Sequence, residues 1–119
     1  MQKQYLGKNN LIKMDGFIIR QPYSGQIIKG EKKFEFRNFR TAKLNTPVYL
    51  LSEGHVLGKI MFTEIKKRRG KWKYAWKIKI IKKIKNPWKY EHPMGAQRWV
   101  KDVKPKKTQN SAIKRNKKT

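Results

Sequence analysis

The stretch Gly30-Glu31-Lys32-Lys33-Phe34-Glu35-Phe36-Arg37 decides the fold of this chain of 119 residues. From residue 33 onwards its side chains alternate in character. In an extended strand the two phenylalanines point to one face, while Glu35 and Arg37 point together to the other. The alternation predicts a strand over 33–40.

A short helix is predicted immediately before this strand. Pro22 suits the first turn of a helix, where its missing N–H costs nothing. Tyr23 and Ile27 lie four residues apart and so share one helical face, and Gly30 suits the position after a helix end. The pattern predicts a helix over 22–30 that packs on a sheet.

Further strand patterns extend in both directions. Apolar or alternating runs predict strands at 17–20, 48–52, 56–65, 72–80 and near 93–100. Gly58 indicates a bulge, and Asn86-Pro87 is expected to end the element that begins at residue 72. Four to six strands with one or two short helices predict a fold that is mainly β with minor α, built as a small, strongly curved sheet or barrel.

The opening stretch also carries a motif. It fits the pattern G-x-K-x-x-E-x-R, whose four fixed positions are filled here by Gly30, Lys32, Glu35 and Arg37. A predicted strand, Gln21-Pro22-Tyr23 and a helix precede it. On these residues the chain resembles the ASCH family, the ASC-1 homology domains related to the PUA fold. The resemblance extends loosely over residues 14–103.

This resemblance implies a PUA-like β-barrel with a cleft beside the first helix, into which Lys32, Glu35 and Arg37 project. It also implies a role connected with RNA, in translation or coactivation. Some family members resemble ribonucleases, and one bacterial branch is a small amidohydrolase of acetylated cytidine, whose motif lysine is thought to be catalytic. That branch has a threonine where this chain has Glu35, which argues against amidohydrolase activity here.

The same side chains allow interpretations that need no family. Glu35 and Arg37 either form an ion pair that fixes a barrel seam or present a guanidinium that grips phosphate through two parallel bonds. Lys32 is expected to bind phosphate rather than to act as a nucleophile or base. Those roles would require its pKa to be lowered by Arg37 and the general positive field.

The charge of the chain points to a polyanionic partner. Its 32 Lys and Arg against 7 Asp and Glu give a formal net charge of +25, and self-repulsion on that scale opposes compaction. Nucleic acid, an anionic membrane surface and an acidic protein all qualify, and a solvated lysine-rich surface is the alternative. The longest apolar run, Val48-Tyr49-Leu50-Leu51, is too short to span a membrane, and no cysteine is present. We expect a soluble, cytoplasmic protein without membrane contact.

The densest positive charge falls on a predicted hairpin. Residues 65–89, the basic hairpin, contain twelve Lys or Arg and no acid. Lysines on one strand face can follow a phosphate backbone. Trp72, Tyr74 and Trp76 alternate in phase with the isoleucines that follow, so they are expected in the core. Trp88, expected in a loop, is the better candidate for base stacking.

The residues for catalysis are sparse. The seven acids are scattered, so no carboxylate cluster for metal-ion chemistry is expected. His55 and His92 are expected to be separate, exposed loop residues, so no histidine pair for acid–base cleavage is indicated. If the chain is an enzyme, we expect a metal-independent hydrolase of RNA or a modified nucleoside that uses Lys32 with Glu35 or Tyr23.

The chain is expected to divide into three parts. These are a basic N-terminal arm over 1–13, an ASCH/PUA-like domain over 14–103 and a disordered basic tail over 104–119. The tail holds seven basic residues, no acid and one large aliphatic residue, which is too little to bury for it to order itself.

The sequence therefore predicts a monomeric nucleic-acid-binding module, with RNA preferred over DNA and with no metal or cofactor. The cleft around the motif is expected to choose the ligand, while the hairpin and tail supply general affinity for phosphate. The residues expected to contact nucleic acid are Arg20, Gln21, Tyr23, Lys32, Glu35, Arg37, Lys67, Arg68, Arg69, Lys71, Lys73, Lys77, Lys79, Trp88 and Arg98. A hydrolase using Lys32, a DNA-binding protein, and docking to a ribosome or another ribonucleoprotein are the alternatives.

Overall fold

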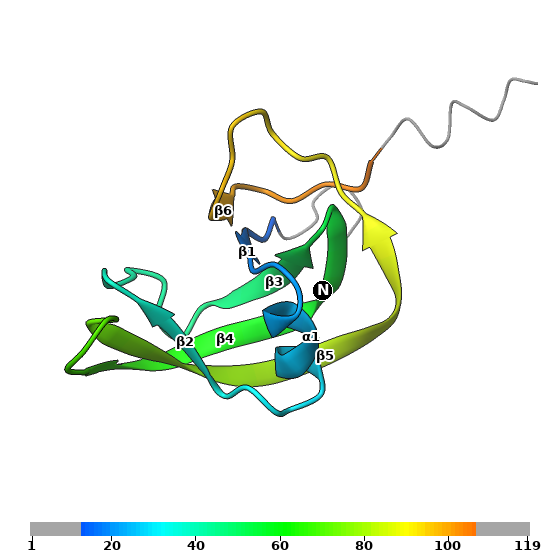
Figure 1. Cartoon of the computed structure of the whole chain (residues 1–119). Coiled ribbons are helices and arrows are strands. Elements are labelled where there is room, and N and C mark those ends of the chain that lie inside the picture. Colours follow the sequence, from blue (N-terminus) through cyan, green and yellow to red (C-terminus); the bar gives the residue numbers. More distant parts are fainter. Residues whose placement is uncertain (1–12, 107–119) are drawn as a thin grey trace, which may run out of the picture.

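The computed structural model describes residues 13–106, so nearly all of the predicted arm and most of the predicted tail lie outside the described residues. One six-stranded sheet and one short helix make up this part of the chain (Figure 1). In chain order the elements are β1 (Gly16–Ile18), α1 (Tyr23–Ile28), β2 (Phe34–Arg37), β3 (Pro47–Ser52), β4 (His55–Lys67), β5 (Tyr74–Lys89) and β6 (Trp99–Val100). The predicted mainly β fold with minor α is confirmed.

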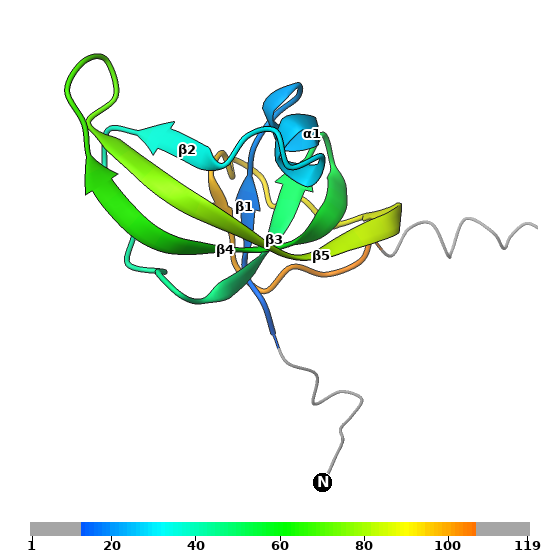
Figure 2. The ribbon, with the colours of Figure 1, turned by 90° about the horizontal axis from the view of Figure 1, so that it is seen from below.

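The strands are not arranged in chain order. The sheet runs β2-β5-β4-β3-β1-β6, and β1 and β3 are its parallel neighbours while the other pairs are antiparallel. The sheet curls into a half-barrel, so that β2 and α1 lie over the same side of the long β4–β5 hairpin (Figure 2). The tip of this hairpin projects beyond the rest of the sheet.

Aromatic side chains fill the inside of the curl. The rings of Phe17, Phe62 and Trp76 are fully buried, and their centroids lie 5.1–5.5 Å apart. The indole N–H of Trp76 donates to the carbonyl oxygen of Phe39 at 3.0 Å, which satisfies the polar atom of the largest core residue. Trp76 therefore lies in the core, as its alternation with the following isoleucines predicts, and Tyr74 packs against that core.

Helix α1 is held on the sheet by one small polar and one apolar contact. Ile27 is buried in the core, and the hydroxyl groups of Ser24 and Ser52 form a buried hydrogen bond of 2.8 Å. Gly30 follows the helix with a φ of +81°, a left-handed conformation that favours glycine. The predicted end of the helix is confirmed, but Tyr23 does not share the burial of Ile27, since its side chain is 47% exposed.

The expected end of the last long strand at Asn86-Pro87 is wrong. Strand β5 continues to Lys89, because the β4–β5 register shifts between Val56, which pairs with Trp88, and Gly58, which pairs with Lys83. Pro87 falls within this bulge, where a missing N–H does not break the ladder. The bulge predicted at Gly58 is confirmed.

The two ends of the described chain meet the sheet. The amide of Val103 donates to the carbonyl oxygen of Met14 at 2.9 Å. Lys106 donates to the carbonyl oxygen of Lys89 at 3.0 Å, and Pro105 forms a bridge with Tyr90. Residues 104–106, predicted to begin a disordered tail, are therefore paired with the end of β5. No helix within residues 13–106 has the length and apolar character to cross a membrane.

Candidate functional site

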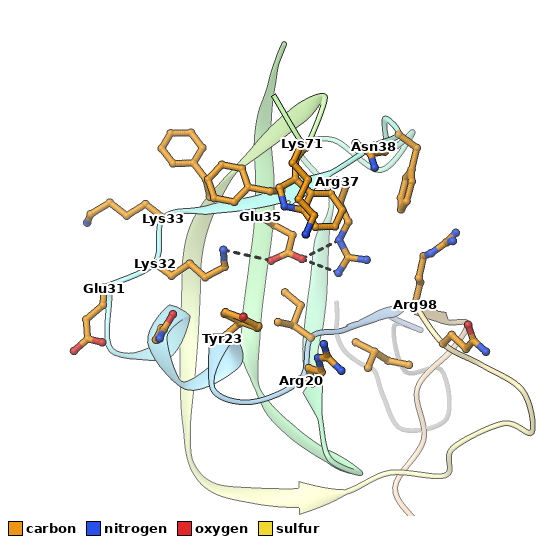
Figure 3. Close-up of a pocket in the computed structure, with 18 residues that line it drawn as sticks. Arg20, Tyr23, Glu31, Lys32, Lys33, Glu35, Arg37, Asn38, Lys71 and Arg98 are labelled. Atoms are coloured by element: carbon orange, nitrogen blue, oxygen red, sulfur yellow. Dashed lines mark hydrogen bonds and ion pairs between the residues drawn. The ribbon is translucent and has the colours of Figure 1, made fainter. Parts of the chain in front are cut away.

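An open cleft with a volume of about 1090 Å³ lies between α1 and β2. Figure 3 shows Lys33, Lys71 and Asn38 along the β2 side of this cleft, with Tyr23 and Arg20 on the side of the helix. Six cationic side chains line it, against two carboxylates. The cationic residues are Arg20, Lys32, Lys33, Arg37, Lys71 and Arg98, and the acidic ones are Glu31 and Glu35. The lining therefore favours an anionic ligand.

Glu35 joins two cations in the middle of the cleft. Arg37 donates from Nε and Nη2 to the Oε2 atom of Glu35, at 2.8 and 2.7 Å, and the Nζ atom of Lys32 lies 3.8 Å from Oε1. Figure 3 shows the three side chains pointing toward one another. The ion pair predicted between Glu35 and Arg37 is present, and it leaves the guanidinium with further N–H groups for a ligand.

The environment of these charges is partly dry. Glu35 is buried, and the guanidinium carbon of Arg37 lies 4.8 Å from the ring centroid of the core residue Phe17. Burial lowers the pKa of Lys32, the carboxylate of Glu35 opposes this by raising it, and the charge of Arg37 lowers it further. The direction is the one that a nucleophilic or proton-transferring lysine requires.

Seven of the predicted contact residues line the cleft, and they come from distant parts of the chain. They are Arg20, Tyr23, Lys32, Glu35, Arg37, Lys71 and Arg98. Arg98 precedes β6, and its guanidinium carbon lies 4.5 Å from the ring centroid of Phe39. The other predicted contact residues lie outside the cleft, namely Gln21, Lys67, Arg68, Arg69, Lys73, Lys77, Lys79 and Trp88.

Several of these outer residues are engaged with the protein itself. The Oε1 atom of Gln21 accepts from the amide of Gly25 at 3.1 Å. Arg68 lies with its guanidinium carbon 4.4 Å from the ring centroid of Phe36. Trp88 is a half-buried part of β5 whose ring packs edge-on against Tyr49 at 5.6 Å, so the expectation of a loop residue free to stack on a base is wrong.

The exposed lysines of β5 form a second basic surface. Lys77 and Lys79 are exposed and alternate with Trp76 and Ile78, which contact the core. Among residues 13–106, no lysine of β5 forms an ion pair with a carboxylate. The positive charges of this surface are therefore not neutralised by carboxylates of the described residues and can bind an external polyanion. This agrees with the prediction that the lysines on one strand face follow a phosphate backbone.

Trp72 lines the cleft, although the sequence pattern predicts it in the core. It was expected in the core, because it is in phase with Trp76, but β5 begins only at Tyr74. The indole of Trp72 is 36% exposed and lines the cleft from the hairpin tip. Gly70 lies in the turn directly before Lys71 and Trp72. It was the sequence signal that these two residues belong to the turn rather than to the strand.

The two histidines line one pocket, which the sequence does not indicate, and His55 is a half-buried residue that begins β4 rather than an exposed loop residue. His55 and His92 both line a second pocket of about 430 Å³ beside Tyr90. His92 uses both ring nitrogens, with Nδ1 2.8 Å from the hydroxyl of Tyr90 and Nε2 2.9 Å from the carbonyl oxygen of Ala96. These bonds give His92 a structural role in the loop. Across the described residues, no group of three His, Asp or Glu side chains is placed to hold a metal ion.

Comparison with protein-family models finds no match for this chain, and comparison with the curated proteins finds none. The resemblance to the ASCH domains therefore stays a prediction that rests on the motif residues.

Proposed function

We propose that the chain binds nucleic acid in the cytoplasm, with RNA as the preferred partner, through the cleft and the exposed lysines of β5. The observation that carries this proposal is the lining of the cleft, where six cations face two carboxylates. One of those carboxylates, Glu35, is already engaged by Arg37 and Lys32. The remaining positive charge is available to phosphate.

The contacts divide by their chemistry. Arg20 and Arg98 are exposed at the cleft and suit phosphate, to which a guanidinium can donate two parallel bonds. Arg37 is held in place by Glu35 and suits a ligand atom that reaches the floor of the cleft. Lys77 and Lys79 extend the contact along the outside of β5, where they supply affinity without reading sequence.

The preference for RNA rests on the ASCH-like motif, since phosphate contacts alone suit DNA equally well. Docking to a ribonucleoprotein is included in this proposal, because contacts between exposed lysines and phosphate do not depend on base sequence.

Binding across a salt series tests the proposal. Fluorescence anisotropy with labelled single-stranded RNA, duplex RNA and duplex DNA should give binding that weakens steeply with salt, with RNA bound more tightly at each salt concentration. Arg98→Ala should reduce the log–log salt slope by about 0.7 for single strands, the share of one phosphate contact. Lys29→Ala removes one charge from the exposed end of α1, outside the cleft, and serves as the matched control. Weak binding to all three ligands at low salt would contradict the proposal. Tighter binding of duplex DNA than of RNA would show that DNA, not RNA, is the preferred partner.

A second candidate is hydrolysis of RNA or a modified nucleoside with Lys32 as the reactive group. The lowered pKa of Lys32 and its position 3.8 Å from Glu35 favour it. Incubating the protein with RNA and separating the products tests for turnover. A Lys32→Ala variant that still binds RNA but loses product formation, next to an active Lys33→Ala control, would support it. Intact RNA after prolonged incubation with the unaltered protein would reject it.

A further inference from the structure

Two aromatic side chains stand exposed at the same cleft. Among the described residues, the large hydrophobic side chains that are substantially exposed are those of Tyr23, Trp72, Ile81 and Met94. The two aromatic ones both line the cleft, and the two aliphatic ones do not. Exposed indole and phenol rings are costly to leave in water, so their shared position indicates a ligand with a flat apolar face.

The backbone around Trp72 is held in place. The Arg68 side chain donates from Nη1 to the carbonyl oxygen of Trp72 at 3.2 Å. The amide of Lys73 donates to Oδ1 of Asn38 at 2.9 Å, and the amide of Arg68 donates to the carbonyl oxygen of Lys73 at 2.8 Å. The hairpin tip is thus tied both across itself and to the residue after β2. An aromatic side chain on a fixed backbone loses little conformational freedom when it stacks on a ligand.

The rings come from different elements. Tyr23 begins α1, and the Nζ atom of Lys32 lies 5.7 Å from its ring centroid. Trp72 comes from the hairpin tip beside Lys71, whose Nζ atom lies 5.3 Å from the indole centroid. Each ring therefore has a cation next to it. This pairing of an aromatic face with a nearby cation suits a nucleotide, whose base stacks while its phosphate meets the charge.

We propose that the cleft takes an unpaired base of a single-stranded nucleic acid, which stacks on Trp72, with Tyr23 as the second stacking surface. The inference rests on the proposed function and narrows its ligand to the single-stranded class. Bases within a duplex stack on each other and offer no free face to the indole of Trp72. Binding of a duplex then rests on the phosphate contacts of lysines and arginines, without stacking.

Three ligands of equal length test the inference at one salt concentration. They are a single-stranded RNA, an abasic single strand that keeps the phosphates, and a blunt RNA duplex. Trp72→Ala should weaken binding of the single-stranded RNA by about 5- to 150-fold, the loss of one stacked base worth about 1–3 kcal/mol. The same variant should bind the abasic strand and the duplex as the unaltered protein does.

Two further variants separate stacking from folding. Trp72→Phe keeps a flat ring and should retain most of the affinity for single-stranded RNA. Met94→Ala removes a fully exposed large side chain outside the cleft and the hairpin, and it should change nothing. Unchanged RNA binding by Trp72→Ala, or an equal loss on all three ligands, would overturn the inference while nucleic-acid binding itself stands. If the unaltered protein binds none of the three at low salt, the proposed function fails and the inference falls with it.

Discussion

Glu35 on β2 lies directly opposite Trp76 on β5, so a carboxylate and the largest buried side chain of the core project from the same side of the sheet. The next residue along, Phe36, pairs with Ala75 and alternates onto the other face of the strand, where its ring centroid lies 4.4 Å from the guanidinium carbon of Arg68 and 4.8 Å from the Nζ atom of Lys32. Strand β2 therefore turns its charged face inward. Because Glu35 and Arg37 lie on the inward face of β2, the bottom of the cleft carries charged groups that are held in place next to the aromatic core.

The inward carboxylate stabilises the fold because it satisfies Arg37. Glu35→Ala leaves the guanidinium of Arg37 and the ammonium of Lys32 close together without their shared partner, and we expect the free energy of unfolding to fall by about 1–3 kcal/mol. Glu35→Gln keeps an acceptor and should lose less. Urea denaturation measures both.

Glu31→Ala is the matched control for this prediction. Glu31 is an exposed carboxylate of the same cleft and has no ion-pair partner within residues 13–106. Its removal should leave the urea midpoint unchanged. A Glu35→Ala protein as stable as the Glu31→Ala protein would show that the inner ion pairs contribute nothing to folding.

The elements of this fold are legible in the sequence, but their order in the sheet is not. Side-chain alternation predicts the β2 strand, and the residues at its preceding helix ends, Pro22 and Gly30, have the roles that their backbone preferences indicate. Alternation cannot say which face is buried, and in β2 the two phenylalanines favour the wrong one. The partner strand β5 settles the matter, and it lies some forty residues further along.

The sequence predicts the part of the site that lies within one short segment, but not the residues that come from elsewhere in the chain. The motif brings Lys32, Glu35 and Arg37 together because they lie within six residues of one another. That Lys71 and Arg98 reach the same cleft depends on the curl of the sheet, which no local pattern encodes. The prediction that Trp72 lies in the core is wrong because the alternation of side chains continues through Trp72, whereas strand β5 begins only at Tyr74.

The lowered pKa of Lys32 makes stability depend on pH. At pH values between this lowered pKa and the usual lysine pKa, the unfolded chain binds more protons at this position than the folded one. The contribution of Lys32 to the free energy of unfolding therefore rises as pH rises through that range. We expect Lys32→Met to remove this rise, and Lys33→Met, at the exposed neighbouring residue, to keep it. Denaturation midpoints at a series of alkaline pH values provide the measurement, and identical pH curves for the two variants would contradict the assignment.

Gly58 is required by the close approach of β5. A Cβ atom at this position would lie 2.5 Å from the carbonyl oxygen of Lys82, which is backbone and cannot move aside cheaply. Gly58→Ala should therefore lower the free energy of unfolding by about 1–3 kcal/mol, the usual cost of overpacking. Gly25→Ala is the comparison, since its new Cβ would meet only the flexible end of the Gln21 side chain. Thermal unfolding of both variants measures the difference, and equal melting temperatures would show that the bulge relaxes freely.

The β4–β5 hairpin stores like-charge repulsion that salt should relieve. Lys59 and Lys82 lie directly opposite each other in its ladder, an arrangement that destabilises a strand pair. Lys82→Glu turns the pair into an attractive one and should stabilise the fold by about 0.2–1 kcal/mol at low salt. The gain in stability should be smaller in 1 M salt, where the Debye length is only about 3 Å and the attraction between the two side chains is screened. Lys29→Glu makes the same charge change away from the ladder, so the excess of Lys82→Glu over it in melting temperature isolates the cross-strand pair. An equal gain from both variants would assign the effect to net charge rather than to the Lys59–Lys82 contact.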